Sequence, residues 1–275
     1  MKFTKMQGCG NDYVYVNCME ETIDDPSALS VRISDRHFGI GSDGLILIGA
    51  SDKADFSMEI YNADGSVAMM CGNGIRCVGK FVYDKGLTDK TTVTVDTRSG
   101  VKTLQLTVEN GKVSRVLVDM GRPVLESAQI PVKHSKKQVI GEPVTVADRQ
   151  WEMTCVSMGN PHCVVPVEDV EGLDLETVGP AFEWLEIFPE RVNTEFIRVD
   201  SRDHVTMRVW ERGSGETFAC GTGACAVAVA CIVNGWTNEL VTVSLRGGDL
   251  TIRWDREQDT VLMEGPAVTV FEGTI

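Results

Sequence analysis

The 275-residue sequence lacks the basic surplus that proteins binding nucleic acids or anionic membranes need. It contains 26 Lys and Arg residues against 40 Asp and Glu residues, so its formal net charge is −14 at pH 7. Binding to phosphate groups depends on Lys and Arg side chains that neutralise them. The composition therefore predicts neither a nucleic-acid partner nor a membrane partner.

The sequence also lacks a long hydrophobic run. No apolar stretch approaches the roughly 18 residues of a membrane-spanning helix. The first residues, MKFTKMQGCGNDYVYV, contain neither an uninterrupted apolar core nor a small-residue cleavage site. We therefore expect a cytoplasmic protein. Its apolar share of 43% is ordinary for a globular chain, and its length suits about two domains.

Metal-binding patterns are missing as well. The nine cysteines are an odd number, which does not suggest a disulfide framework, and the four histidines are scattered. The two cysteine clusters, CGNGIRC at 71–77 and ACGTGACA at 219–226, lack the C-x-x-C spacing of tetrahedral zinc sites. We expect no metal and no cofactor, and we expect most of the thiols to be buried.

Short alternating segments outnumber helical ones, which predicts an α+β fold rather than a doubly wound parallel sheet. Asn110-Gly111 is the clearest hairpin turn. The predicted strands lie at 104–108, 113–118, 205–209, 241–245, 250–254 and 268–271. The predicted helices lie at Pro26 to about His37, Gly74 to Lys85, Leu175 to Phe188, and Thr222 to Val233.

A repeat spans the two halves of the sequence. Cys71 and Cys220 are 149 positions apart (220 − 71 = 149), and both stand in Cys-Gly-x-Gly turns before predicted helices. The same offset pairs further turn and helix-end residues, which are Gly10-Asn11 with Gly159-Asn160, Gly74 with Gly223, and Gly86 with Gly235. It also matches Tyr61 with Trp210. Matched glycines arise by chance in a glycine-rich chain, but a cluster of matches at one offset favours an internal duplication.

Both cysteine turns have the features of an acid or base site. Unpaired N–H groups and the positive end of the helix dipole suit a substrate carboxylate, and they are expected to lower the pKa of a thiol. Cys77, Cys225 and Cys231 fall inside the predicted helices, where packing is the simpler interpretation. Packing alone is also the simpler interpretation of any one cysteine at a tight turn, but here it must account for two copies.

Two cysteines on equivalent turns suggest a racemase or an epimerase. One base removes a proton from one face of a carbon, and an acid delivers a proton to the other face. We therefore predict that Cys71 and Cys220 face one another across a cleft between two related lobes. A racemase acting on a smaller amino acid such as proline, and a binding module without chemistry, are the alternatives.

The residues around the turns differ between the halves, which predicts an asymmetric specificity pocket. The offset pairs Gly44 with Asn193 and Asn62 with Glu211. Arg212 suits a second substrate carboxylate, and Glu211 suits an ammonium group, although a solvated ion pair is the simpler interpretation of this pair alone. His162, two residues beyond Asn160, is a candidate for tuning a thiol or orienting the substrate, or equally for a structural role.

At these residues the sequence resembles the diaminopimelate epimerases, which interconvert LL- and meso-diaminopimelate on the route to lysine and peptidoglycan. The resemblance runs nearly end to end. It is carried by GNDYVYV, RHFGIGSDGL, YNADGS, MCGNGIRC, VSMGNPHC, FPERVN, ERGSGET and ACGTGACA. The proline racemases share the paired-cysteine plan, but they resemble this chain much less around the first turn, where they usually have histidine in place of Asn73.

The resemblance implies two similar lobes related by pseudo-twofold symmetry, each a strand-rich barrel around a central helix. It implies an N-terminal lobe at 1–120, joined by a C-terminal strand at 266–275, a second lobe at 121–265, and a homodimer. Cys71 and Cys220 would be the acid/base pair of a reaction without pyridoxal phosphate, and His162 and Glu211 would tune the thiols. The implied substrate contacts are Asn11, Asn62, Gly72, Asn73, Asn160, Asn193, Glu211, Arg212, Gly221 and Thr222. Some members have glutamine where this chain has Gly44, so a contact there would be lost or made differently.

Overall fold

The structure, a computed structural model, describes residues 1–275, and the chain divides into two compact units. Unit 1 comprises Met1–Asp119 and Glu264–Ile275, and unit 2 comprises Met120–Met263. The expected excess of strands over helices is confirmed, since the chain forms 18 strands and four helices. None of the helices is long and apolar enough to cross a membrane.

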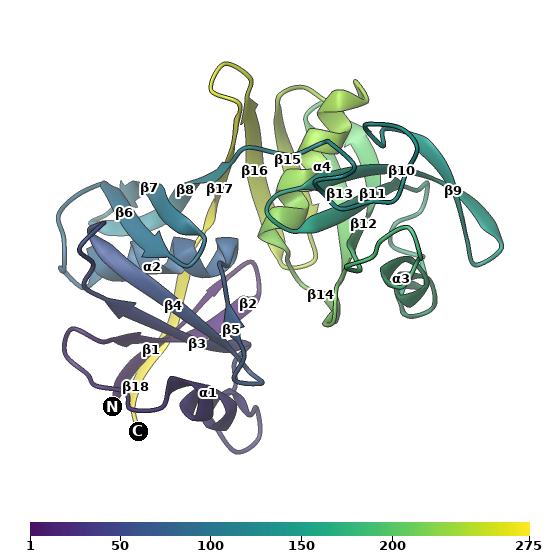
Figure 1. The fold of residues 1–275 in the computed structure, drawn as a ribbon. Coiled ribbons are helices and arrows are strands. Elements are labelled where there is room, and N and C mark those ends of the chain that lie inside the picture. Colours follow the sequence, from purple (N-terminus) through teal and green to yellow (C-terminus); the bar gives the residue numbers. More distant parts are fainter. The chain divides into compact units, whose positions relative to one another are not determined.

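Unit 1 contains two helices and nine of the strands (Figure 1). Its elements are β1 (Lys2–Gly8), β2 (Asn11–Asn17), α1 (Pro26–Ser34), β3 (Gly44–Gly49), β4 (Phe56–Asn62), β5 (Val67–Ala68), α2 (Gly72–Asp84), β6 (Thr92–Thr97), β7 (Gly100–Glu109), β8 (Lys112–Gly121) and β18 (Val268–Thr274). β1 pairs with β2 and β18, β2 runs parallel to β3, and β7 pairs with both β6 and β8. α2 contacts β1, β2, β7 and β18, so strands surround this helix.

Unit 2 is built on the same plan. Its elements are β9 (Glu142–Val146), β10 (Arg149–Ser157), β11 (Pro161–Pro166), α3 (Leu175–Glu183), β12 (Asn193–Ser201), β13 (His204–Glu211), β14 (Gly215–Thr217), α4 (Gly221–Val233), β15 (Leu240–Leu245), β16 (Gly248–Asp255) and β17 (Thr260–Pro266). α4 contacts β10, β11, β12, β15 and β16. The boundary between the units falls within β8 and β17.

The repeat offset of 149 carries over from the sequence to the elements. Adding it to the bounds of α1 (26 and 34) gives 175 and 183, the bounds of α3, and adding it to those of α2 (72 and 84) gives 221 and 233, the bounds of α4. Strand register follows the same rule. Tyr13 pairs with Gly44 across β2 and β3, and His162 pairs with Asn193 across β11 and β12. The two units therefore place corresponding residues at corresponding backbone positions.

The central helix of unit 2 is apolar on every side. α4, GTGACAVAVACIV, has no charged residue, and ten of its 13 residues are buried. A helix that is hydrophobic all round is stable only when it is surrounded by protein. α2 also has ten buried residues but places Lys80 and Asp84 near its end, where the ammonium and carboxylate lie 2.7 Å apart. Both helices end before a glycine with positive φ, Gly86 and Gly235.

Two predicted helices are shorter than expected. α1 ends at Ser34 rather than His37, because the Asp35 carboxylate accepts hydrogen bonds from the backbone N–H groups of His37 and Phe38 and so forms a turn. α3 ends at Glu183, and the chain beyond it continues in tight turns that close at Phe188. The next residue is a proline, which cannot continue a helix.

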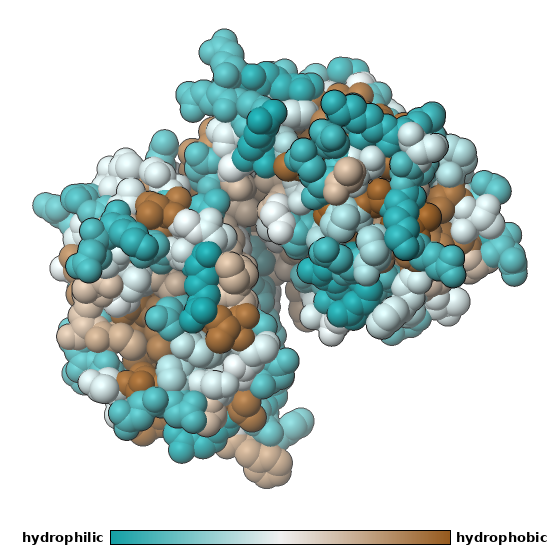
Figure 2. All heavy atoms as spheres, in the orientation of Figure 1, coloured by the Kyte–Doolittle hydropathy of each residue, from teal (hydrophilic) through white to brown (hydrophobic).

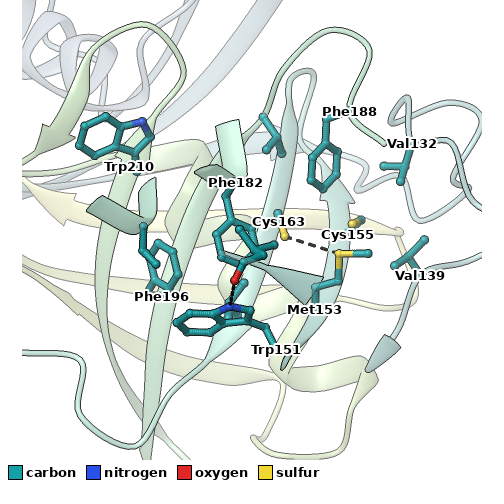
Figure 3. Packing of buried hydrophobic residues seen from close by; sticks show 14 of the residues in the cluster. Val132, Val139, Trp151, Met153, Cys155, Cys163, Phe182, Phe188, Phe196 and Trp210 are labelled. Carbon is teal, nitrogen blue, oxygen red and sulfur yellow. Dashed lines mark hydrogen bonds between the residues drawn. The ribbon is translucent and has the colours of Figure 1, made fainter. Parts of the chain in front are cut away.

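α3 packs over an aromatic cluster in unit 2 (Figure 3). Phe182 meets Trp151 and Phe196 edge to face, with ring centroids 5.6 and 5.4 Å apart. The Trp151 indole N–H donates to the carbonyl of Val146, so its polar atom is satisfied inside the core. This cluster fixes β10 and β12, and β12 supplies part of the candidate site.

The faces visible in Figure 2 are mainly hydrophilic in both units, with separate hydrophobic areas between the polar residues. This matches the net charge of −14. The exposed large apolar side chains include Met69 and Phe218, which stand two residues before the two cysteines at the same offset of 149.

Candidate functional site

Cys71 stands at the N-cap of α2 in unit 1. The Gly74 N–H donates to its sulfur at 3.3 Å, so the thiol side chain caps the helix. The Cys71 thiol donates to Asn11 Oδ1 at 3.2 Å, and the Asn73 amide donates to the same oxygen at 3.5 Å. The structure therefore brings three predicted site residues of unit 1 together at one helix N-terminus.

Charged residues that the sequence analysis did not select hold this group in place. Asp43 accepts from the Asn11 side-chain amide at 2.7 Å, and Arg36 lies 2.9 Å from the same carboxylate group. Arg76 is fully buried and donates to Asn73 Oδ1 at 2.9 Å and to the carbonyl of Gly72 at 3.2 Å. Burial raises the pKa of Asp43, as does the charge of Asp12 beside it.

Position 44 has no room for a side chain. A Cβ atom on Gly44 would lie 2.2 Å from the carbonyl oxygen of Tyr61 and 2.9 Å from the Tyr13 ring. A glutamine cannot occupy this position without a shift of the backbone. Asn62, the partner of Gly44 in the β3–β4 register, donates its side-chain amide to Ser66 at 3.0 Å. The structure thus places Asn62 at the end of β4, beside the turn that contains Ser66.

Cys220 stands at the N-cap of α4 in unit 2, and its surroundings differ from those of Cys71. Its sulfur makes no side-chain cap bond, although the Gly223 N–H lies near it, and it lies 3.5 Å from the Thr222 hydroxyl. Glu211 of β13 is hydrogen bonded to this thiol, and its carboxylate accepts from the Thr217 hydroxyl at 2.5 Å. Gly221 is the first residue of α4.

The expectation that the helix dipole lowers the thiol pKa is wrong for Cys220. Burial raises the pKa of this thiol well above its ordinary value, and the charges of Glu211 and Glu195 add to the effect. The dipole of one helix end contributes up to about 2 kcal/mol, which two nearby carboxylates and burial exceed here. Burial also raises the pKa of Glu211.

His162 lies in unit 2 and is fully buried. Its Nδ1 is 2.7 Å from Glu195 Oε1, and its Nε2 is 3.0 Å from Asn160 Oδ1. The structure therefore joins two predicted site residues through one imidazole ring. Glu195 was missed by the sequence analysis, although the repeat offered a signal, because the offset of 149 pairs this acidic residue with Ile46.

Asn193, the first residue of β12, lies beside Arg212, which follows β13 directly. Asn193 Oδ1 accepts from the backbone N–H of Arg212 at 2.9 Å, and the Arg212 guanidinium donates to the carbonyl of Glu190 at 2.7 Å. Glu183 supports the turn by accepting from the backbone N–H of Gly213 at 2.9 Å. A guanidinium has five N–H groups, so a ligand carboxylate could still be bound.

The two units thus carry corresponding groups of candidate residues. Each half has a cysteine at a helix N-terminus, where backbone N–H groups suit a carboxylate, and asparagine side chains nearby. No group of three or more His, Cys, Asp or Glu side chains in residues 1–275 is arranged to hold a metal ion. None of the nine cysteines forms a disulfide.

Sequence comparison gives full-length matches. The family model described as diaminopimelate epimerase matches residues 3–126 and 154–270. The diaminopimelate epimerase of Agathobacter rectalis is 60% identical over 282 residues, which cover 100% of this chain and 99% of that protein. The diaminopimelate epimerase of Methanococcus maripaludis is 55% identical over 275 residues, with the same coverage.

Solved structures share the fold at low identity. A PhzF-family phenazine biosynthesis protein of Bacillus anthracis aligns with a TM-score of 0.72 at 17% identity, covering 100% of this chain and 99% of that one. A probable proline racemase of Agrobacterium radiobacter K84 aligns with a TM-score of 0.73 at 13% identity, covering 100% and 92%. These likenesses confirm the predicted fold class.

Proposed function

Since the chain belongs to the diaminopimelate epimerase family, we propose that Cys71 and Cys220 carry out its reaction as a two-base pair. The activity itself, an isomerisation of diaminopimelate in lysine biosynthesis, follows from the close full-length relatives. The assignment of the thiols is supported by one observation above all. Both cysteines are N-cap residues of helices that the repeat makes equivalent.

In the proposed reaction one cysteine, as thiolate, takes the α-proton from one face of the substrate carbon. The C–H electron pair stays on the substrate and is delocalised into its α-carboxylate. The other cysteine, as thiol, then delivers its proton to the opposite face, so that the first sulfur ends as thiol and the second as thiolate. The product is the epimer, and no cofactor takes part.

The helix N-termini would hold the α-carboxylate as negative charge develops on it. Gly72 and Asn73 begin α2, and Gly221 and Thr222 begin α4, and backbone N–H groups at such positions stabilise an oxyanion. Such a contact strengthens as the proton leaves, so it lowers the barrier rather than only binding the substrate.

The remaining site residues would select the substrate. Arg212 would bind the distal carboxylate, and Glu211, with Asn11, Asn62, Asn160 and Asn193, would bind the amino and carboxylate groups around the reacting carbon. The Glu211 carboxylate and His162 would also tune the thiols, because Glu211 is bonded to the Cys220 thiol and lies in the field of His162. The meso-diaminopimelate formed would also serve as a precursor of peptidoglycan.

Alanine variants test the assignment of the thiols. Cys71→Ala and Cys220→Ala should each abolish epimerisation of LL-diaminopimelate while circular dichroism shows an intact fold. Cys231→Ala, a buried cysteine on the far part of α4, is the matched control and should keep near-normal activity. Full activity in either of the first two variants would refute the assignment.

A racemase acting on a smaller amino acid is the second candidate, because proline racemase-like proteins share the fold. Identity of 13% supports the fold alone, whereas relatives at 55 and 60% identity favour diaminopimelate. Substrate profiling separates the two candidates. Diaminopimelate should be turned over and proline should not.

The protein is proposed to act in the cytoplasm as a homodimer, as the family resemblance leads us to expect. β18 has exposed apolar side chains that a second copy would cover, with Val268 41% exposed and Val270 54% exposed. Thiols that must stay reduced to react are in keeping with a reducing compartment.

A further inference from the structure

The internal repeat allows the surroundings of the two cysteines to be compared position by position. Gly74 and Gly223 follow the cysteines at the same spacing. A Cβ atom on Gly74 would lie 2.7 Å from the Ile46 side chain, and one on Gly223 would lie 2.6 Å from Glu195 Oε1. The offset of 149 relates positions 46 and 195, so a methyl group in unit 1 is replaced by a carboxylate in unit 2.

The contrast extends to the neighbouring positions. Tyr13 corresponds to His162, and Asn62 corresponds to Glu211. Cys220 is therefore accompanied by two carboxylates and an imidazole, where the corresponding positions around Cys71 have an alkyl group, a phenol and an amide. The backbone plan is shared, so the difference in charge lies in the side chains.

Glu195 occupies a position that is costly for a carboxylate. Its side chain is fully buried, and Oε1 meets His162 Nδ1 at 2.7 Å. Oε2 is buried with no hydrogen-bond partner. A buried carboxylate with an unpartnered oxygen costs free energy, which an apolar side chain such as that of Ile46 would avoid. A buried residue that costs free energy without stabilising the fold is typical of a functional site.

The groups that bear on Cys220 come from three strands. Glu195 of β12 and Glu211 of β13 both raise the pKa of the Cys220 thiol, after burial, and His162 of β11 lowers that of Glu211. α4 contributes its N-terminal N–H groups and no charged side chain. Cys163 of β11 also lies in the field of Glu195, and burial raises its pKa well above the ordinary value.

We propose that Glu195 is a positioning residue of the reaction, which fixes the His162 ring against Asn160 and keeps the Cys220 thiol protonated in the resting protein. In a turnover that starts from the resting protein, Cys220 is then the thiol that delivers a proton to the substrate carbon after the other cysteine has removed the α-proton. The carboxylate acts along two routes, by orienting Nδ1 of His162 and by its charge at the first turn of α4. This inference rests on the proposed role of Cys220.

Thiolate-selective alkylation tests the inference on the whole protein. Iodoacetamide labelling at a series of pH values, followed by peptide mass spectrometry, gives a separate pH midpoint for each cysteine. In the unaltered protein the Cys220 midpoint should lie at least about one pH unit above the Cys71 midpoint. The midpoint reports the pKa of each thiol, whereas the labelling rate also depends on how easily the reagent reaches the sulfur.

Glu195→Gln removes the charge and keeps the size. It should lower the Cys220 midpoint by about one pH unit and leave the Cys71 midpoint unchanged, since Ile46 is the residue beside Gly74 in unit 1. Glu195→Asp retains a carboxylate and should restore most of the original Cys220 midpoint. A Cys220 midpoint that stays fixed or rises in Glu195→Gln would overturn the inference.

Failure of this inference can be distinguished from failure of the proposed function. If Cys220→Ala remains active, the two-base assignment fails whatever the labelling shows. If Cys220→Ala is inactive and the midpoints of the unaltered protein coincide, the role of Glu195 fails alone, and this second measurement needs no variant that must fold.

Discussion

At the residue scale, the candidate site depends on what surrounds each side chain rather than on the side chain itself. Cys71 and Cys220 occupy equivalent N-caps, yet the Cys71 sulfur caps its helix and bonds Asn11, whereas the charges of Glu211 and Glu195 act on the Cys220 thiol. The sequence predicted both cysteines, because they stand in matched Cys-Gly-x-Gly turns. It could not predict the difference between their surroundings. Glu195 is 25 positions from Cys220 in the sequence (220 − 195 = 25), and the two residues come close only because of how β12 pairs in the sheet.

Arg212 carries a prediction about substrate binding. Arg212→Lys keeps the charge but removes the planar fork that pairs with a carboxylate, so the KM for diaminopimelate should rise about 10- to 100-fold with a smaller change in kcat. Steady-state kinetics measures both. Arg253→Lys, an exposed residue of β16, is the matched control and should behave as the unaltered protein does. An unchanged KM in Arg212→Lys would show that the distal carboxylate is bound elsewhere.

Gly44 illustrates a limit of prediction at the same scale. The family resemblance indicates only that this chain has glycine where some members have glutamine. The reason is a carbonyl oxygen of β4, which would lie 2.2 Å from a Cβ atom. Gly44→Ala should therefore lose activity and stability together, as judged by kinetics and thermal unfolding, whereas an alanine at the open position Gly159 would meet no atom within 4 Å and be strained only by its φ of 95°.

At the element scale, the helices that carry the cysteines were predicted well and their ends less so. α2 and α4 begin two residues and one residue before the predicted starts, because Gly72 and Gly221 already have helical geometry after the cysteine cap. α1 and α3 end early, for reasons found in Asp35 and in the turns before Pro189. Apolar periodicity sets the body of a helix, but side-chain caps set its ends.

The cap bond of Cys71 predicts a difference in stability between two inactive variants. A serine hydroxyl can accept from the Gly74 N–H and an alanine methyl cannot. Cys71→Ser should therefore unfold about 2 to 4 °C above Cys71→Ala, which corresponds to about 1 kcal/mol in a protein of this size. Scanning calorimetry measures the difference.

The control for this comparison lies inside α4. Cys231 is buried in the helix, where a serine would bring a hydroxyl into an apolar environment. Cys231→Ser should therefore be no more stable than Cys231→Ala. Equal melting temperatures for the two Cys71 variants would show that the sulfur does not stabilise the start of α2.

At the scale of the whole molecule, the duplication is the organising feature. A single offset of 149 relates helix bounds, strand register and cysteine position. The duplication could be predicted from the matched glycines, asparagines and cysteines, because turns and helix caps restrict the residue type most strongly. Among the residues that differ between the halves, Asn193, Glu211 and Arg212 were predicted as site residues, whereas Glu195 was not, because it lies outside the turns that mark the repeat.

The proposed homodimer gives a prediction at this scale. Light scattering should give a mass of about twice the 30.1 kDa of one chain. Val270→Lys places a charge among the exposed apolar side chains of β18 and should shift the mass to that of one chain without unfolding it. Val101→Lys, at an exposed apolar position on β7, is the control and should leave the dimer intact. A Val270→Lys variant that keeps the mass of two chains would place the dimer surface elsewhere.

The central claim is that two different sulfur atoms exchange protons with one substrate carbon. Its most direct test is the conversion of LL-diaminopimelate in deuterated water, with mass spectrometry of both isomers at early times. The account predicts that each molecule of new meso isomer carries one deuterium at the inverted carbon, while the remaining LL isomer carries almost none, because the proton is removed by one thiolate and replaced from the other, solvent-equilibrated thiol. A meso product that retains the original hydrogen would mean that one group removes and returns the same proton, and it would contradict the account.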